Sequence, residues 1–351
     1  MPPFPYIWMK HDQFMRISLK LVACVLSALP LLSLRIPVSY AQQPSGWLHP
    51  DLSMLAYATG MYDADAGQGR LSTRAAVSAT FGRGSNTEAS VSYDLIDKKL
   101  MGCELLWTPV QALRVRAGIQ RMPFLLETSY SPRTLEAVGF SQAASYLGGY
   151  SRDLSGRNSR SRDTGVTVEG LFLPRDGGYN VISAVAGLFI GNGYSFEDDN
   201  DAKDFHGRLV IQPSRHWKVS AGAMLGRYGE DELVRNRFSA GFWYDDGRWF
   251  VRSENIYGVT DGLSSDGFAV LGGCWFTGRM ALSARYDRFQ TDLSDPLTAT
   301  TQTQACFTHM LSADRGFSYR LQYGHAFHSD PSVPDSNTLS CSLIMRFGAR
   351  L

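Results

Sequence analysis

The chain has 351 residues and nearly balanced charge, with 34 lysines and arginines against 33 aspartates and glutamates. That balance indicates neither nucleic acid nor a polyanion as a partner. Residues 21–34 form an apolar run of 14 residues, which is shorter than the ~20 residues of a membrane-spanning helix. No later segment is apolar enough for one, so a helical membrane protein is excluded.

The N-terminal segment has the three parts of a secretory signal peptide. Arg16 and Lys20 precede the apolar run, and Ser39 to Ala41 end in a small-residue cleavage pattern. We therefore predict a cleaved signal over residues 1–41, with Met1 or Met15 as the true initiator. These 41 residues hold four basic residues and one acidic residue, so the mature chain, 42–351, carries 30 basic and 32 acidic residues.

The mature chain divides into sixteen short segments in which apolar and polar residues alternate. This period of two is typical of β-strands with one apolar face. The predicted strands are 52–62, 70–81, 86–97, 101–108, 113–121, 163–172, 179–189, 203–212, 216–226, 234–245, 248–257, 266–277, 279–290, 302–311, 316–327 and 338–351. No segment shows a sustained helical period.

The connections between these strands alternate in length. Tight turns such as Asp246-Gly247 alternate with longer connections near 122–162, 190–202, 227–233, 258–265, 291–301 and 328–337. Short turns on one rim and long loops on the other are typical of outer-membrane barrels. A soluble β-sandwich or propeller would also alternate, but it would not place Arg74, Gln322 and Ser340 on its buried face. The prediction is an all-β, closed antiparallel transmembrane β-barrel of about 16 strands.

The residues that could carry chemistry are few. Cys103, Cys274, Cys306 and Cys341 are isolated and are interpreted as single apolar residues on strands. Neither a Gly-x-Ser-x-Gly nor a His-Glu-x-x-His motif is present. We therefore predict no enzyme activity, no catalytic residue, no metal site and no cofactor.

The longest connection, 122–162, is rich in arginine and joins two strands with polar faces. Loops this long in compact domains are normally functional or disordered. We predict that it is the third outer loop, folds into the barrel and narrows it. The pore-lining, anion-binding candidates are Arg114, Arg116 and Arg121 before the loop and Arg152, Arg157, Arg160 and Arg162 at its end. Lys218, on a distant strand, is expected to matter less.

Strand parity predicts a basic interior. Fourteen basic and six acidic residues are expected to point inward. The basic ones are Arg70, Arg74, Arg114, Arg116, Arg208, Lys218, Arg235, Arg237, Arg248, Arg252, Arg279, Arg285, Arg320 and Arg346, and the acidic ones are Glu88, Asp94, Glu104, Glu169, Glu254 and Asp287. An excess of arginine in a pore favours anions, because the low-dielectric wall focuses the field along it.

Residues 113–172 also resemble a known family. Val115-Arg-Ala-Gly-Ile-Gln-Arg-Met-Pro-Phe124, Tyr146-Leu-Gly-Gly-Tyr150 and Arg162-Asp-Thr-Gly165 resemble the phosphate-selective porin O and P family, in its Bacteroides-type members. The resemblance implies a sixteen-stranded barrel, a homotrimer, and a third outer loop folded inward. Ile119 and Arg121 depart from the aromatic and lysine residues of the family pattern, and lysine is scarce.

The predicted function is passive diffusion of small hydrophilic solutes across the outer membrane, with a preference for phosphate or other inorganic anions. The expected partners are small anions and outer-membrane lipid, together with two further copies of the chain. A non-selective general porin is the alternative within this class. From another class, an outer-membrane barrel hydrolase or an adhesin remains open.

Overall fold

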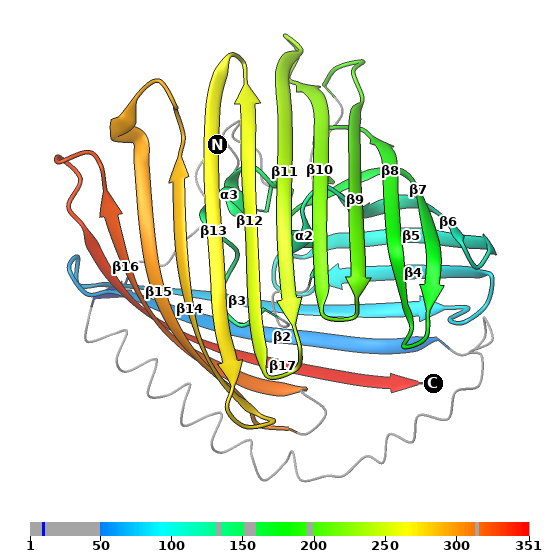
Figure 1. Ribbon diagram of the computed structural model, residues 1–351, viewed down its shortest axis with the longest axis horizontal. Coiled ribbons are helices and arrows are strands. Elements are labelled where there is room, and N and C mark those ends of the chain that lie inside the picture. Colours follow the sequence, from blue (N-terminus) through cyan, green and yellow to red (C-terminus); the bar gives the residue numbers. More distant parts are fainter. Residues whose placement is uncertain are drawn as a thin grey trace.

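The computed structural model describes residues 9–10, 50–130, 135–150, 159–194, 199–312 and 316–350. Within these ranges sixteen antiparallel strands, β2 to β17, make up most of the chain (Figure 1). They are β2 (Asp51–Asp63), β3 (Gln68–Phe81), β4 (Thr87–Asp94), β5 (Lys99–Val110), β6 (Leu113–Arg121), β7 (Arg162–Arg175), β8 (Tyr179–Phe189), β9 (Asp204–Ser214), β10 (Trp217–Tyr228), β11 (Leu233–Asp245), β12 (Trp249–Thr260), β13 (Leu263–Trp275), β14 (Met280–Gln290), β15 (Ala299–Met310), β16 (Phe317–His328) and β17 (Ser336–Arg350). Each overlaps one predicted strand. The two-residue β1 (Met9–Lys10) pairs with the start of β3.

The sheet is closed. Each strand from β2 to β17 pairs with its neighbours in sequence, and β17 pairs with β2 from Thr338↔Asp63 to Arg350↔Asp51. The predicted sixteen-stranded antiparallel barrel is therefore confirmed. Because the strand number is even, Asp51 and Arg350 lie at the same end, which also carries the short turns. No helix in the described ranges is long and apolar enough to cross a membrane.

The outward faces of the strands are apolar, as predicted. Leu321, Leu339 and Phe347 are 48%, 54% and 45% exposed, whereas the alternate residues Ser340 and Ser342 are buried at 6% and 4%. Exposed apolar side chains along every second position suit hydrocarbon better than water. The register of β17 and the predicted direction of its side chains are thus confirmed.

This register predicts the outcome of a thiol-labelling experiment on β3. Ser72 pairs with Thr59, which bonds to Ser342, so Ser72 lies on the lumen face, where it is exposed; Val77 lies on the outer face. In a variant without native cysteines, Ser72→Cys should react with a membrane-impermeant thiol reagent in intact vesicles. Val77→Cys should stay at least ~10-fold slower, because hydrocarbon covers it. Equal labelling rates at the two positions would contradict the register.

One predicted connection is wrong. The segment 258–265 was expected to be a long outer loop, but only Asp261 and Gly262 separate β12 from β13. Both residues have positive φ, 50° and 80°, which matches the two-residue type I′ hairpin that Asp-Gly favours. The strands therefore continue through most of that segment. The longest connection, 122–161, is present as predicted.

Candidate functional site

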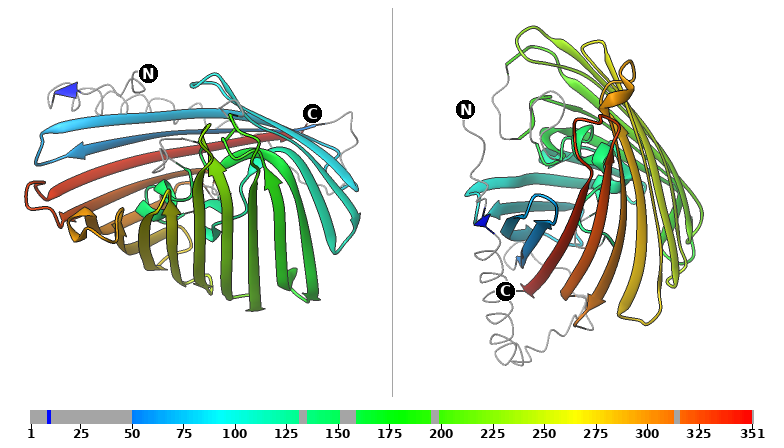
Figure 2. Two further views of the ribbon diagram at one scale, coloured as in Figure 1. Left: turned by 90° about the horizontal axis from the view of Figure 1, so that it is seen from above. Right: turned by 90° about the vertical axis from the view of Figure 1, so that its left-hand side faces the viewer.

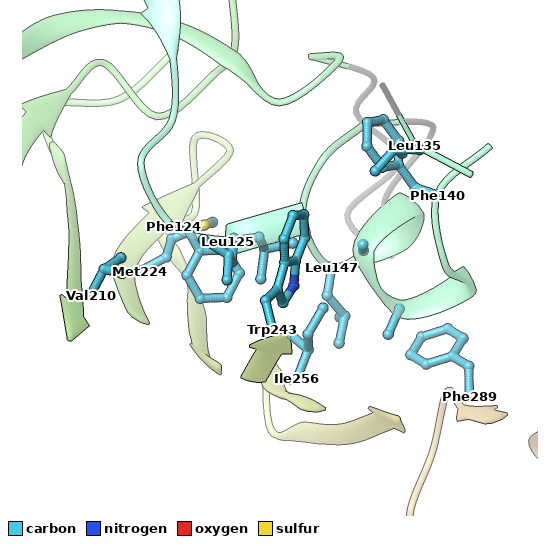
Figure 3. Close-up of a cluster of buried hydrophobic side chains, with 13 residues drawn as sticks. Phe124, Leu125, Leu135, Phe140, Leu147, Val210, Met224, Trp243, Ile256 and Phe289 are labelled. Carbon is cyan, nitrogen blue, oxygen red and sulfur yellow. The ribbon is translucent and has the colours of Figure 1, made fainter. Parts of the chain in front are cut away.

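The connection 122–161 is called here the inner loop. Its described parts, 122–130, 135–150 and 159–161, turn into the barrel and pack on one side of its interior (Figure 2). They contain two short helices, α2 (Leu126–Ser129) and α3 (Gln142–Tyr146). Apolar side chains of the loop meet apolar lumen-side residues of β9 to β12 and β14 (Figure 3). The cluster comprises Phe124, Leu125, Leu126, Leu135, Phe140, Ala143, Ala144 and Leu147 of the loop and Val210, Met224, Trp243, Ile256 and Phe289 of the wall.

Glycines on this wall allow the close approach. A Cβ at Gly222 of β10 would lie 2.2 Å from the carbonyl oxygen of Phe124, and one at Gly267 of β13 would lie 2.3 Å from the Cβ of Ala143. Both separations are far below van der Waals contact, so a side chain at either glycine would push the loop away. The absence of side chains at these two positions therefore lets the inner loop pack directly against the barrel wall.

Buried wall carboxylates fasten both helices of the loop. Glu254 of β12 accepts the backbone N–H groups of Leu126 and Glu127 at 2.8 and 2.9 Å. Asp287 of β14 accepts the backbone N–H of Gln142 at 2.8 Å. These N–H groups begin α2 and α3 and have no partner within the helix, so the carboxylates satisfy donors that would otherwise be buried unpaired.

A charged pair fastens the segment between the two helices. Glu136 of the loop pairs with Arg252 of β12, whose guanidinium lies 4.2 Å from the ring centre of Trp243. Burial raises the pKa of the Glu136 carboxyl, while the charge of Arg252 lowers it. Nearby, Arg285 donates to the carbonyl oxygen of Gly139 at 3.0 Å. The loop is thus held by several independent contacts on one wall.

On the opposite side of the loop lies a water-accessible cavity of about 340 Å³, called here the arginine cavity. Five arginines and two glutamates line it: Arg114, Arg116, Arg121, Arg162 and Arg208 with Glu104 and Glu169. They come from β5, β6, β7 and β9, and the loop supplies Met122, Pro123 and Ser129. The cavity therefore lies between the inner loop and the barrel wall and has a formal charge of +3.

Only two of the five arginines have a carboxylate partner among the contacts of the described residues. Arg114 lies 3.5 Å from Glu169, and Arg116 lies 3.3 Å from Glu104. Arg121 instead donates to the carbonyl oxygens of Thr128 and Tyr130 at 2.7 and 2.8 Å. A carbonyl positions a guanidinium without cancelling its charge. The uncompensated charge is therefore centred on Arg121, Arg162 and Arg208.

Of the seven predicted anion-binding residues, four line this cavity: Arg114, Arg116, Arg121 and Arg162. Arg160 lies elsewhere. It pairs with Asp94 at 3.1 Å and with Asp97, and Asp94 also accepts from Arg74 at 2.9 Å. Arg160 therefore holds the end of the inner loop to the β4–β5 turn. Arg152 and Arg157 lie outside the described residues.

Arg160→Gln tests the conclusion that Arg160 lies outside the arginine cavity and instead holds the end of the inner loop. The change should leave the zero-current potential of the channel unaltered, because Arg160 does not line the arginine cavity. It should increase brief current closures, since the partly buried pair with Asp94 no longer holds the loop end. Single-channel recording reads both quantities. A shift in zero-current potential as large as that caused by Arg162→Gln would show that Arg160 belongs to the pore.

Two other expectations about charge are wrong. Lys218, expected to be distant, donates to the Tyr130 hydroxyl at 2.9 Å and so contacts the inner loop. The inward excess of eight positive charges is also too large. Arg248 and Arg279 are exposed at the rim, while Asp163 and Asp204 are buried and were left out. Asp204 pairs with Arg235 at 2.7 Å.

The sequence pattern did not assign Arg208 to the site, although parity placed it inward. Its side chain donates to the carbonyl oxygen of Leu125 at 2.7 Å and to Ser129. It thus links β9 to the loop and also lines the cavity. Alternation along β9 predicted the direction of the Arg208 side chain, but its place beside the inner loop, in the same cavity as Arg121, depends on the path of that loop.

No group of three His, Cys, Asp or Glu residues that could hold a metal occurs in the described ranges.

No protein-family model and no curated protein matches the chain. Solved structures do. The anion-selective porin from Comamonas acidovorans has a TM-score of 0.64 at 12% identity, covering 85% of this chain and 99% of its own. OmpF of Salmonella typhi, solved with daunomycin, has a TM-score of 0.63 at 10% identity, covering 85% and 97%. OprB of Pseudomonas putida has a TM-score of 0.62 at 10% identity, covering 88% and 100%. The chain therefore has the porin fold.

Proposed function

We propose that the protein is an outer-membrane porin that lets small hydrophilic solutes diffuse passively and prefers anions. The observation that carries the proposal is the arginine cavity, a space of about 340 Å³ bounded by five arginines and two glutamates. A net positive charge in a narrow, low-dielectric passage attracts anions and repels cations. The apolar outer face of the strands supports membrane insertion, and the predicted signal over residues 1–41 supports export.

The resemblance of residues 113–172 to phosphate-selective porins supports phosphate as one of the anions. A guanidinium can donate two parallel hydrogen bonds to a phosphate, which a monovalent halide cannot match. Arg121 and Arg162 are the residues proposed to bind the phosphate, because neither forms an ion pair with a carboxylate among the described residues. Assembly as a homotrimer is part of the same proposal.

A non-selective general porin is the second candidate. The pairing of Arg114 with Glu169 and of Arg116 with Glu104 favours it, because paired charges leave little net field. The two candidates differ in the sign and size of the zero-current potential under a potassium chloride gradient. Inhibition of chloride current by millimolar phosphate would then separate a phosphate site from a general anion preference.

A hydrolase and a pore-free adhesin are the candidates from other classes. Planar-bilayer recording tests both, because neither requires a stable conductance. The full chain, expressed with its N-terminal segment, should fractionate with the outer membrane and migrate differently on gels before and after heating. Recovery as a soluble protein, or bilayers without conductance steps together with lipid or peptide hydrolysis, would overturn the proposal.

A further inference from the structure

The rim that carries the short turns has three regularly placed arginines. Arg215, Arg248 and Arg279 lie in the turns β9–β10, β11–β12 and β13–β14, and all three side chains are exposed. These are successive turns on one rim, so they recur every second strand, or about 10 Å apart at the usual strand spacing. The spacing is comparable to that of neighbouring lipid headgroups.

An aromatic belt lies on the outer face immediately beside these turns. Trp217, Trp249 and Phe276 are 45%, 52% and 50% exposed, and Trp217 lies 4.8 Å from the ring of Tyr244. Such aromatic residues mark the boundary between hydrocarbon and headgroups. The three arginines lie in the turns immediately beyond this aromatic belt, where the headgroup region of a membrane begins.

Arg248 shows the direction of one of these side chains. Its guanidinium lies 5.9 Å from the ring centre of the outward-facing Trp249, so it leans toward the membrane side of the wall. The acids of the same turn are engaged locally. Asp246 accepts the backbone N–H groups of Arg248 and Trp249 and the hydroxyl of Tyr244, and Asp245 lies 3.5 Å from Arg252. The Arg248 guanidinium therefore remains available to an external anion.

The two rims differ in charge. In the described residues, the short turns hold four basic and two acidic residues, whereas the connections at the opposite end, without the inner loop, hold two basic and twelve acidic residues. An anionic membrane surface would be attracted to the first rim and repelled by the second.

We propose that the turns β9–β10, β11–β12 and β13–β14 bind the headgroups of anionic phospholipids in the periplasmic leaflet. Arg215, Arg248 and Arg279 pair with the headgroup phosphates, and Trp217 and Trp249 pack against the glycerol and upper acyl region. The assignment of this rim to the periplasmic side rests on the proposed outer-membrane location. This lipid binding does not depend on the ion selectivity of the pore, because Arg215, Arg248 and Arg279 lie in turns at the rim, outside the arginine cavity.

The test is native mass spectrometry of the delipidated full-length protein with equimolar phosphatidylglycerol and phosphatidylethanolamine of identical acyl chains. The wild type should retain phosphatidylglycerol preferentially. The variant R215Q/R248Q/R279Q should lose about fivefold in affinity for each arginine that reaches a headgroup. The matched control, K98Q/K99Q/K203Q, removes three positive charges at the opposite rim and should keep the preference. Heat-dependent gel migration verifies that both variants fold.

Equal retention of the two lipids by the wild type would overturn the proposal, as would an equal loss in both triple variants. If the arginine variant does not fold, salt supplies the second measurement. The preference of the wild type should fall steeply between 0.1 M and 1 M salt, where screening shortens from ~10 to ~3 Å, and a salt-independent preference would contradict charge recognition. Bilayer conductance of the same sample separates the two proposals: lipid preference without conductance would overturn only the pore.

Discussion

Replacement of Arg121 and Arg162 by glutamine should move the zero-current potential of the channel toward cation preference. These two residues supply two of the three formal positive charges that the glutamates of the arginine cavity leave uncompensated. Even at the dielectric constant of bulk water, a unit charge at 4 Å contributes about 1 kcal/mol, or about fivefold in relative permeability. The double change should therefore lower the anion-to-cation permeability ratio severalfold, measured by bilayer recording under a potassium chloride gradient.

The matched control removes the same two charges from the rim. Arg215→Gln with Arg279→Gln should leave the zero-current potential nearly unchanged, because salt at 0.1 M screens exposed charges beyond ~10 Å. Lys218 is unsuitable as a control, since it bonds to Tyr130 of the inner loop. An unchanged potential in the Arg121/Arg162 variant, or an equal shift in the rim variant, would remove the arginine cavity as the selectivity filter.

Replacement of Glu254 and Asp287 by alanine should release the inner loop and raise single-channel conductance. The change leaves the backbone N–H groups of Leu126, Glu127 and Gln142 without acceptors. A buried unpaired donor costs about 1–3 kcal/mol, so three of them would offset much of the apolar packing that holds the loop. Conductance and protease cleavage within residues 122–161 measure the release.

Asp266→Ala is the control for this change, because the Asp266 carboxylate accepts from Asn255 and forms no hydrogen bond to the described residues of the inner loop. It should alter neither conductance nor cleavage. The barrel itself should stay folded in all variants, since the strand pairings do not involve these side chains. A double variant with wild-type conductance and a protected loop would show that apolar packing alone suffices.

The barrel could be predicted from the sequence because its determinants are local. Alternation along Leu339 to Phe347 sets which face meets lipid, and the count of such segments sets the number of strands. The loop predicted over 258–265 is absent because Asp261-Gly262 forms a two-residue hairpin turn, and Asp-Gly between alternating segments is a strong hairpin signal.

The path of the inner loop could not be predicted in the same way, because non-local contacts determine it. In the sequence, Gly222 and Gly267 cannot be distinguished from other strand glycines. Their role becomes apparent only in the structure, where Phe124 and Ala143 pack against them. Nothing near Arg160 in the sequence indicates Asp94, which lies 66 residues earlier. Strand parity therefore predicted the inward direction of Arg114 and Arg116, which line the arginine cavity, but parity does not apply to Arg160, which lies within the loop.

The most direct test of the central claim is the zero-current potential of the wild-type channel in a planar bilayer with tenfold different potassium chloride concentrations. The proposed ion path through the arginine cavity, which carries a charge of +3, predicts the sign set by the chloride gradient and a smaller magnitude as total salt rises. A potential of the opposite sign, set by potassium, would contradict the account.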